Sequence, residues 1–315
     1  MKWKKLGQIF DFDKSPLSDT FVSHAQSPQA VVYEDFVRVY FTTRIRDSEK
    51  TFLSIPQFVD FSKDFKNILN YSNKEVIKRG KLGCFDEHGI FPFSPSFVNG
   101  NLYAYVSGLF RGVSVSIDGS IGLAISNDNG LIFTRLGDGP VLSASLFEPF
   151  LVVDPFVRFF NSQYYMFYIR GIKWSNNCPP ERVYKISYAT SLNGIDWQKS
   201  NNLIISNILG DNECQALPTV IDINCVYHMY FCYREMLGFK TEIGKGYKLG
   251  YAYSDDLECW TRDDALGGLF LSSSGFDSEM MCYPNIFRVD KHIYLLYNGN
   301  DFGKLGFGLA ILEEN

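Results

Sequence analysis

"DPFVRFFNSQYYMFYIRG", residues 154–171, contains a complete structural unit. A proline opens a short apolar strand, a polar turn follows at residues 161–163, and an aromatic-rich strand runs on to Arg170. Apolar and aromatic runs on both sides of a polar turn predict an antiparallel hairpin. The stretch decides the fold because the sequence repeats it.

Four other segments share this order of proline, apolar strand, polar turn and aromatic strand. The opening prolines are 67, 60, 63 and 66 residues apart, so five units fill the chain. The segments begin at Ser27, Ser94, Asp154, Leu217 and Tyr283, and their prolines are Pro28, Pro95, Pro155, Pro218 and Pro284.

A second half-motif, made of two further strands around a Ser-Asp/Asn-Gly turn, begins at Ile121, Ile186 and Leu249. Each unit is therefore predicted to be a four-stranded antiparallel sheet. The fifth unit lacks its outer strand, and the segment "MKWKKLGQIF" (1–10) is the candidate that closes the ring. We predict an all-β, five-bladed β-propeller forming a single domain over residues 1–315, rather than a sandwich or a β-helix.

The amino-acid composition limits the classes of function that the chain can have. Apolar residues make up 46% and aromatics 16%, which favours strands, and the net charge of −5 argues against nucleic acid as a partner. No apolar run approaches the roughly 20 residues of a membrane span, and the first residues do not read as a signal peptide. The seven cysteines contain no CxxC pair. We expect a cytoplasmic protein with reduced thiols, no membrane insertion, no metal and no cofactor.

Acidic residues precede the inner strands of most units. In a propeller these connections are expected at one mouth of the ring, so the acids should converge on one axial pocket. Clustered carboxylates raise one another's pKa, which suits the acid and base roles of glycoside hydrolysis; alternatively, they cap turns or bind strand-end amides. The candidate catalytic residues are Asp86, Asp154, Glu213 and Asp277, with Glu87 and His88 as substrate-binding neighbours; the first unit has His24 and Gln26 there.

Arginines follow the aromatic strands of four units. A guanidinium suits a carboxylate or phosphate, so the ligand is predicted to be an acidic or nucleotide-linked sugar; alternatively, the arginines pair with the acids and hold the ring together. Trp174 and Tyr184 flank one loop on this side and can stack on a sugar face, and residues 234–247 form the matching loop. The predicted substrate-binding residues here are Arg44, Arg111, Arg170, Arg234, Trp174 and Tyr283.

These residues resemble those of the five-bladed propeller glycoside hydrolases: arabinanases, β-xylosidases, invertases and levansucrases. Val153-Asp154-Pro155 is similar to the step that carries the transition-state-stabilising or pKa-tuning Asp, and Glu213-Cys214 to the step that carries the general acid. The first unit departs from the family, because residues 24–28 read His-Ala-Gln-Ser-Pro where the family's nucleophile or base Asp stands. The resemblance then implies that Asp86 or Asp277 replaces it, or that hydrolysis is lost.

The segments "GCFDEHGIFP" (83–92) and "IGLAISNDNG" (121–130) resemble an uncharacterised branch of these propellers, often encoded among bacterial surface-polysaccharide genes. The sequence thus favours a glycoside hydrolase-like enzyme of surface-polysaccharide metabolism that acts on a sugar. Its alternative is a carbohydrate-binding propeller without turnover. A protein-interaction propeller would instead show a flat or apolar top face.

Overall fold

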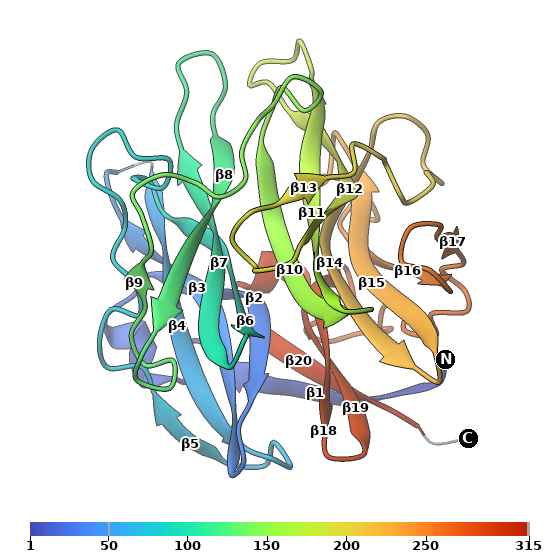
Figure 1. Ribbon diagram of the computed structural model, residues 1–315. Helices are drawn as coiled ribbons and strands as arrows, with labels where there is room; N and C mark the ends of the chain where they lie inside the picture. The colour runs from blue at the N-terminus through green and yellow to red at the C-terminus, as the bar shows by residue number, and fades with distance from the viewer. Residues whose placement is uncertain (50, 314–315) are drawn as a thin grey trace.

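The computed structural model describes residues 1–49 and 51–313, and it contains five four-stranded antiparallel sheets. Figure 1 shows them arranged as the blades of a propeller, so the predicted fold class is confirmed. Blade 1 comprises β2 (Ser23–Val32), β3 (Phe36–Arg46), β4 (Phe52–Ser62) and β5 (Ile68–Tyr71); blade 2, β6 (Ile90–Val98), β7 (Asn101–Phe110), β8 (Asp118–Ser126) and β9 (Thr134–Arg135); blade 3, β10 (Val152–Phe160), β11 (Gln163–Trp174), β12 (Arg182–Ser191) and β13 (Gln198–Lys199); blade 4, β14 (Glu213–Ile223), β15 (Val226–Glu235), β16 (Lys248–Ser254) and β17 (Thr261–Arg262); and blade 5, β18 (Cys282–Val289), β19 (His292–Asn298), β20 (Gly306–Leu312) and β1 (Trp3–Asp11).

The ring is closed by the N-terminal strand, as the sequence predicts. Strand β1 pairs antiparallel with β20, and Figure 1 shows the blue and red ribbons side by side. The five inner strands β2, β6, β10, β14 and β18 each contact the next one around the axis, and β18 contacts β2. Residues from all five blades therefore reach the central axis.

Each inner strand is interrupted by a register shift at its start, and each shift contains an X-Pro step. In blade 2 the shift lies between Ile90 and Phe93, so the matching proline is Pro92 and not Pro95, which the sequence comparison aligns. With Pro92 the proline separations become 64, 63, 63 and 66 residues. Bulges re-aim side chains next to active sites, and three of the unpaired residues, Phe91, Asp154 and Tyr283, line one cavity at this end of the ring.

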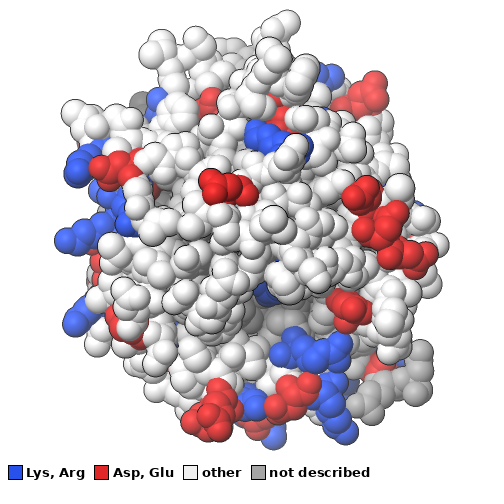
Figure 2. All heavy atoms as spheres, viewed as in Figure 1, with Lys and Arg blue, Asp and Glu red and all other residues white. Residues whose placement is uncertain are grey.

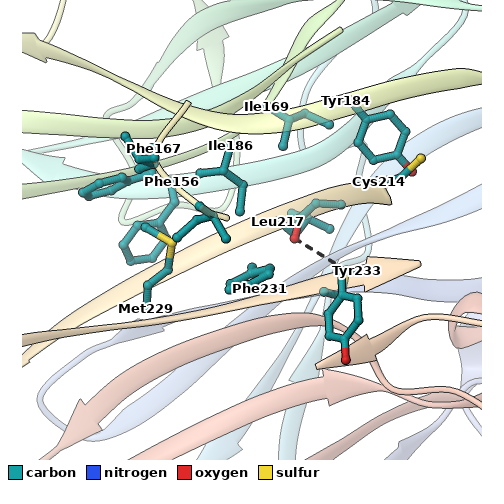
Figure 3. Close-up of a cluster of buried hydrophobic side chains, with 14 of the residues drawn as sticks. Phe156, Phe167, Ile169, Tyr184, Ile186, Cys214, Leu217, Met229, Phe231 and Tyr233 are labelled. Atoms are coloured by element: carbon teal, nitrogen blue, oxygen red, sulfur yellow. Dashed lines mark hydrogen bonds between the residues drawn. The ribbon is translucent and has the colours of Figure 1, made fainter. Parts of the chain in front are cut away.

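Aromatic packing joins neighbouring blades. Figure 3 shows the cluster between blades 3 and 4, where Phe156 and Phe167 face Met229 and Phe231. These four side chains are at most 2% exposed, and burying such a side chain contributes about 1.5–3 kcal/mol.

Tyrosine hydroxyls also link blades. Tyr40 of blade 1 donates to the carbonyl of Gly130 in blade 2, and Tyr105 of blade 2 donates to that of Gly194 in blade 3. Both glycines have positive φ, and a Cβ at either position would lie within 2.8 Å of the tyrosine oxygen. The repeated Asn-Gly turns are thus explained by this close approach.

The remaining features bear on what the surface can do. Acidic and basic side chains are interspersed on the face seen in Figure 2. Helical structure in the described part of the chain is confined to two turns, η1 (Pro16–Asp19) and α1 (Asn300–Gly303), and neither has the length or apolarity to cross a bilayer. Nor do residues 1–49 and 51–313 bring three His, Cys, Asp or Glu side chains together as metal ligands, and all seven cysteines are free thiols.

Candidate functional site

A cavity of about 310 Å³, here called the central cavity, opens at the mouth where the inner strands begin. Its volume lies at the lower end of the roughly 300–1,000 Å³ typical of small-molecule pockets. Each blade contributes a residue from the bulge region of its inner strand: Gln26, Phe91, Asp154, Ala216 and Tyr283. Only blade 3 supplies a carboxylate there.

Asp154 occupies the bulge of β10 and is 6% exposed. Its φ of +59° is part of the repeated bulge, because the matching residues Ser27, Leu217 and Tyr283 also have positive φ. The backbone N–H donates to Ser107 Oγ at 2.9 Å, and Oδ2 accepts from the Leu217 N–H at 3.2 Å. Burial raises the pKa of Asp154 to about 7, although this N–H and Arg182 oppose the rise. Near neutral pH the group can therefore either give or take a proton.

Three arginines, here called the arginine cluster, line the central cavity from different blades: Arg44 (β3), Arg182 (β12) and Arg234 (β15). Arg44 donates to Gln26 Oε1 at 3.1 Å, and burial lowers its pKa. Arg234 is 3% exposed and donates to Tyr184 Oη at 2.8 Å. Among the described residues, none of the three forms an ion pair with a carboxylate.

Aromatic side chains form much of the cavity wall. Tyr184 and Tyr247 share a short hydroxyl–hydroxyl hydrogen bond, and the ring of Tyr247 lies 5.7 Å from that of Tyr283. Figure 3 shows Tyr184 beside Cys214, at the edge of the core between blades 3 and 4. Burial raises the pKa of Tyr184 to about 12, so its hydroxyl stays protonated near neutral pH. Rings with fixed hydroxyls suit a ligand that is apolar on one face and rich in hydroxyls at its edge.

Two more carboxylates line the cavity. Asp118, at the start of β8, has its pKa raised by burial, while the Gly119 N–H and Arg182 oppose the rise. Glu181 lies 3.6 Å from Lys240 Nζ, in an ion pair whose lysine is exposed. Asp118 is thus the second cavity carboxylate without an ion-pair partner among the described residues, and Arg182 acts electrostatically on both Asp118 and Asp154.

The other three predicted acids do not line this cavity. Each is fully buried and paired with a cation on the outermost strand of its own blade, and Glu148 of blade 3 follows the same rule. These carboxylates therefore connect the innermost and outermost parts of a blade. The pairs are Asp86 with Arg135 on β9, Glu148 with Lys199 on β13, Glu213 with Arg262 on β17, and Asp277 with Lys5 on β1.

The physical reason is the path of the connecting segment. It runs from the outer strand of one blade to the axis, so a residue five to seven positions before the bulge proline still lies over the sheet. Glu213 illustrates this, because its carboxylate also accepts the N–H groups of Ile208 and Leu209 in the connection. The expected convergence of four acids is corrected to one, Asp154. Of the alternatives for the other three, binding of backbone amides within the described chain applies to Glu213 alone, whereas Asp86 and Asp277 pair with a cation of their own blade.

The predicted substrate-binding residues divide in the same way. Arg44, Arg234 and Tyr283 line the central cavity. Arg170 instead pairs with Glu148, and Arg111 with Asp47 at 2.7 Å. Glu87 lies 3.2 Å from His88 Nδ1, and neither residue lines the cavity. Trp174 does not line it either, and its ring centroid lies 5.7 Å from the guanidinium carbon of Arg182.

Sequence reasoning missed the residues at the start of the third strands. Asp118 opens β8 and Arg182 opens β12, and both strands begin at the mouth where the second strands end. A signal for them exists: they are the first charged residues after the loops that follow the second strands of blades 2 and 3. Phe91 was missed because Pro95 was aligned in place of Pro92.

The raised pKa of Asp154 predicts a pH dependence of stability. The pKa of Asp154 is about 7 in the folded chain against an ordinary 3.8. Its contribution to the free energy of unfolding is therefore complete below pH 3.8 and is lost progressively as pH rises from 3.8 through 7. In the unmodified protein the free energy of unfolding should fall by on the order of 4 kcal/mol between pH 4 and 8 because of Asp154, and Asp154→Asn should abolish this fall. Urea unfolding of both proteins at pH 4 and pH 8 measures this difference in the free energy of unfolding. The same change in the free energy of unfolding between the two pH values for both proteins would contradict the prediction.

No model of a known protein family matches the chain. Among solved structures, a glycoside hydrolase superimposes with a TM-score of 0.73 at 14% identity, covering 99% of this chain and 93% of that one. An enzyme from Xanthomonas citri, complexed with xylose, gives 0.63 at 14% identity, with 95% and 92% covered. The endo-arabinase from Bacteroides thetaiotaomicron gives 0.64 at 12% identity, with 93% and 96% covered. These likenesses confirm the resemblance in fold to the five-bladed propeller glycoside hydrolases.

In sequence, two uncharacterised proteins of Mycobacterium tuberculosis match the chain from end to end. They are MT1551 of strain CDC 1551 and Rv1502 of strain H37Rv, each 31% identical over 315 residues, with 100% of both sequences covered. That identity over the full length means that this protein belongs to one family with these two mycobacterial proteins.

Proposed function

We propose that the chain is a glycoside hydrolase-like enzyme that acts on a carbohydrate in the central cavity, with Asp154 as the proton-transferring group. The observation that carries the proposal is the burial of Asp154 in this cavity, with its pKa raised to about 7. The aromatic wall and the fold shared with glycoside hydrolases support a sugar as the ligand.

The chemistry needs two carboxyl groups with different proton affinities. Asp154 is about half protonated near pH 7, so it can protonate the oxygen of a leaving group. Burial raises the pKa of the half-buried Asp118 as well, but the Gly119 N–H, which donates to it at 2.8 Å, and Arg182 oppose that rise. We assign Asp118 as the base or nucleophile. Arg182 acts electrostatically on both groups and stabilises the carboxylates.

The test is turnover of a panel of glycans and synthetic glycosides by the unmodified protein and by Asp154→Asn. We expect the substitution to lower kcat roughly 100-fold or more, because an amide cannot transfer the proton. Binding, followed as thermal stabilisation by the same sugar, should persist. Asp290→Asn is the matched control, since Asp290 is an exposed carboxylate that pairs with Lys63 outside the cavity lining. Equal turnover by Asp154→Asn and the unmodified protein would remove the assignment.

A carbohydrate-binding propeller without turnover is the second candidate. The observation that favours it is that Asp86, Glu213 and Asp277 are held in buried ion pairs, which leaves one inner-strand carboxylate in the cavity. Stabilisation by a sugar with no product formed from any glycoside of the panel would support this function over the enzyme.

A further inference from the structure

We propose that the arginine cluster binds an anionic group of the ligand, so that the central cavity selects a monosaccharide unit carrying a carboxylate or a phosphate over its neutral counterpart. This inference rests on the proposed function for the sugar, and it adds the chemical class of the substrate.

The charges of the cavity lining do not cancel. Lys240 and Glu181 offset each other at the rim, which leaves the three arginines against Asp118 and Asp154. Burial raises the pKa of Asp154 to about 7, so its protonated form increases the excess of positive charge near neutral pH. A partly buried cavity with surplus guanidinium charge is stabilised by an anion.

The guanidinium groups also keep unused donors. The Nε atoms of Arg182 and Arg234 are buried, and neither has a hydrogen-bond partner among the described residues. Arg234 is held by Tyr184 and by the carbonyls of Glu235 and Met236, and its guanidinium carbon lies 3.4 Å from the Phe239 ring centroid. A buried donor without a partner is costly, so a ligand oxygen that accepts from it gains affinity.

Two of the arginines are suited to direct contact. Arg44 and Arg182 are half-buried and lie in blades 1 and 3, whereas the fully buried Arg234 fixes Tyr184. Arg44 has Gln26 as its hydrogen-bond partner, and the nearby His24 has a pKa lowered to about 3 by burial and by Arg44, so it stays neutral. Arg44 and Arg182 therefore offer positive charge from different blades to one small ligand.

Asp154 couples this site to pH. The groups that act on it from neighbouring strands are Arg182 on β12, Cys232 on β15 and Tyr283 on β18, together with the Leu217 N–H. Burial raises the pKa of Cys232 and of Tyr283, so both stay neutral near pH 7. Asp154 gains its negative charge as pH rises through 7, and affinity for an anionic sugar should fall over that range.

The experiment measures binding by calorimetry and thermal shift, with no turnover required. The probes are glucuronate and galacturonate for the carboxylate, glucose 6-phosphate for the phosphate, glucose as the neutral control, and inorganic phosphate alone. We expect at least one anionic sugar to bind roughly 10- to 100-fold more tightly than glucose. Preference for the uronates or for the sugar phosphate identifies which anion the cluster takes.

Arg44→Gln and Arg182→Gln should each weaken that binding roughly 10-fold or more, because each removes a charged donor. Arg111→Gln is the matched control: Arg111 directly follows the second strand of its blade but pairs with Asp47 outside the cavity lining, so its replacement should leave binding unchanged. In Asp154→Asn, the fall in affinity between pH 6 and 8 should disappear. Circular dichroism and the melting temperature show that each variant is folded.

Equal binding of glucose and of every anionic sugar, or no binding of any anionic probe at tens of millimolar, would overturn the proposal. Its failure is distinct from failure of the proposed function. Turnover of neutral glycosides that depends on Asp154, without selective binding of anionic sugars, would support the proposed enzyme and contradict the anion preference. Anion-selective binding without turnover would support the anion preference and contradict the proposed enzyme.

Discussion

Replacing Arg135 with methionine is expected to lower the free energy of unfolding by about 3–5 kcal/mol. Both oxygens of Asp86 accept from the Arg135 guanidinium, one at a distance of 2.7 Å, and Asp86 is 0% exposed. No other hydrogen bond to the Asp86 carboxylate exists within the described chain. Methionine keeps much of the volume of arginine, so the loss measures the buried charge left without a partner.

The same pair provides the control. The double variant Asp86→Asn with Arg135→Met removes both charges and should be less destabilised than Arg135→Met alone, which a double-mutant cycle in urea measures. Arg111→Gln breaks the solvent-exposed pair with Asp47 and should change the free energy of unfolding far less. A loss for Arg135→Met as small as that for Arg111→Gln would show that the Asp86 pair does not hold blade 2 together.

The fold was predictable because every blade of a propeller shows the same sequence pattern. Each of five hairpins presents the same alternation of proline, strand, turn and aromatic strand, and one misplaced proline in blade 2 did not change the count. Ring closure was predictable for a similar reason, since Trp3 precedes Lys4 and Lys5 much as Trp197 and Trp260 precede the outer strands β13 and β17. Periodicity of this kind survives errors in individual boundaries.

The site was less predictable because a sequence repeat does not show whether a side chain points toward the axis or lies over the sheet. Asp86 and Asp154 both precede a bulge proline, yet they are six residues and one residue before it, and this difference places one over the sheet and the other at the axis. The systematic placement of acids was a correct observation with a different physical meaning. Each predicted catalytic acid other than Asp154 lies where it can pair with a cation on the outermost strand of its own blade, as Asp277 does with Lys5, and these acids do not share a ligand.

Removing residues 1–13 is expected to abolish cooperative folding. The deletion takes away β1, leaves β20 paired with β19 alone and therefore with one unpaired edge, and removes Phe10 and Phe12, which are each 1% exposed. Loss of one buried Phe side chain costs about 3–5 kcal/mol, and the whole stability of a domain is about 5–15 kcal/mol. The buried Asp277 would also lose Lys5, at 2.7 Å, and the exposed edge would promote aggregation.

Thermal unfolding with circular dichroism measures the effect, and a peptide of residues 1–13 added in trans should restore a cooperative transition, because ring closure needs the strand and not its covalent link. Phe10→Ala gives the intermediate loss of about 3–5 kcal/mol, and Lys4→Ala, at an exposed position of the same strand, gives the matched control near zero. A truncated protein that melts cooperatively within a few degrees of the full one would mean that blade 5 is stable with three strands. The N-terminal strand would then cover an edge without closing the ring.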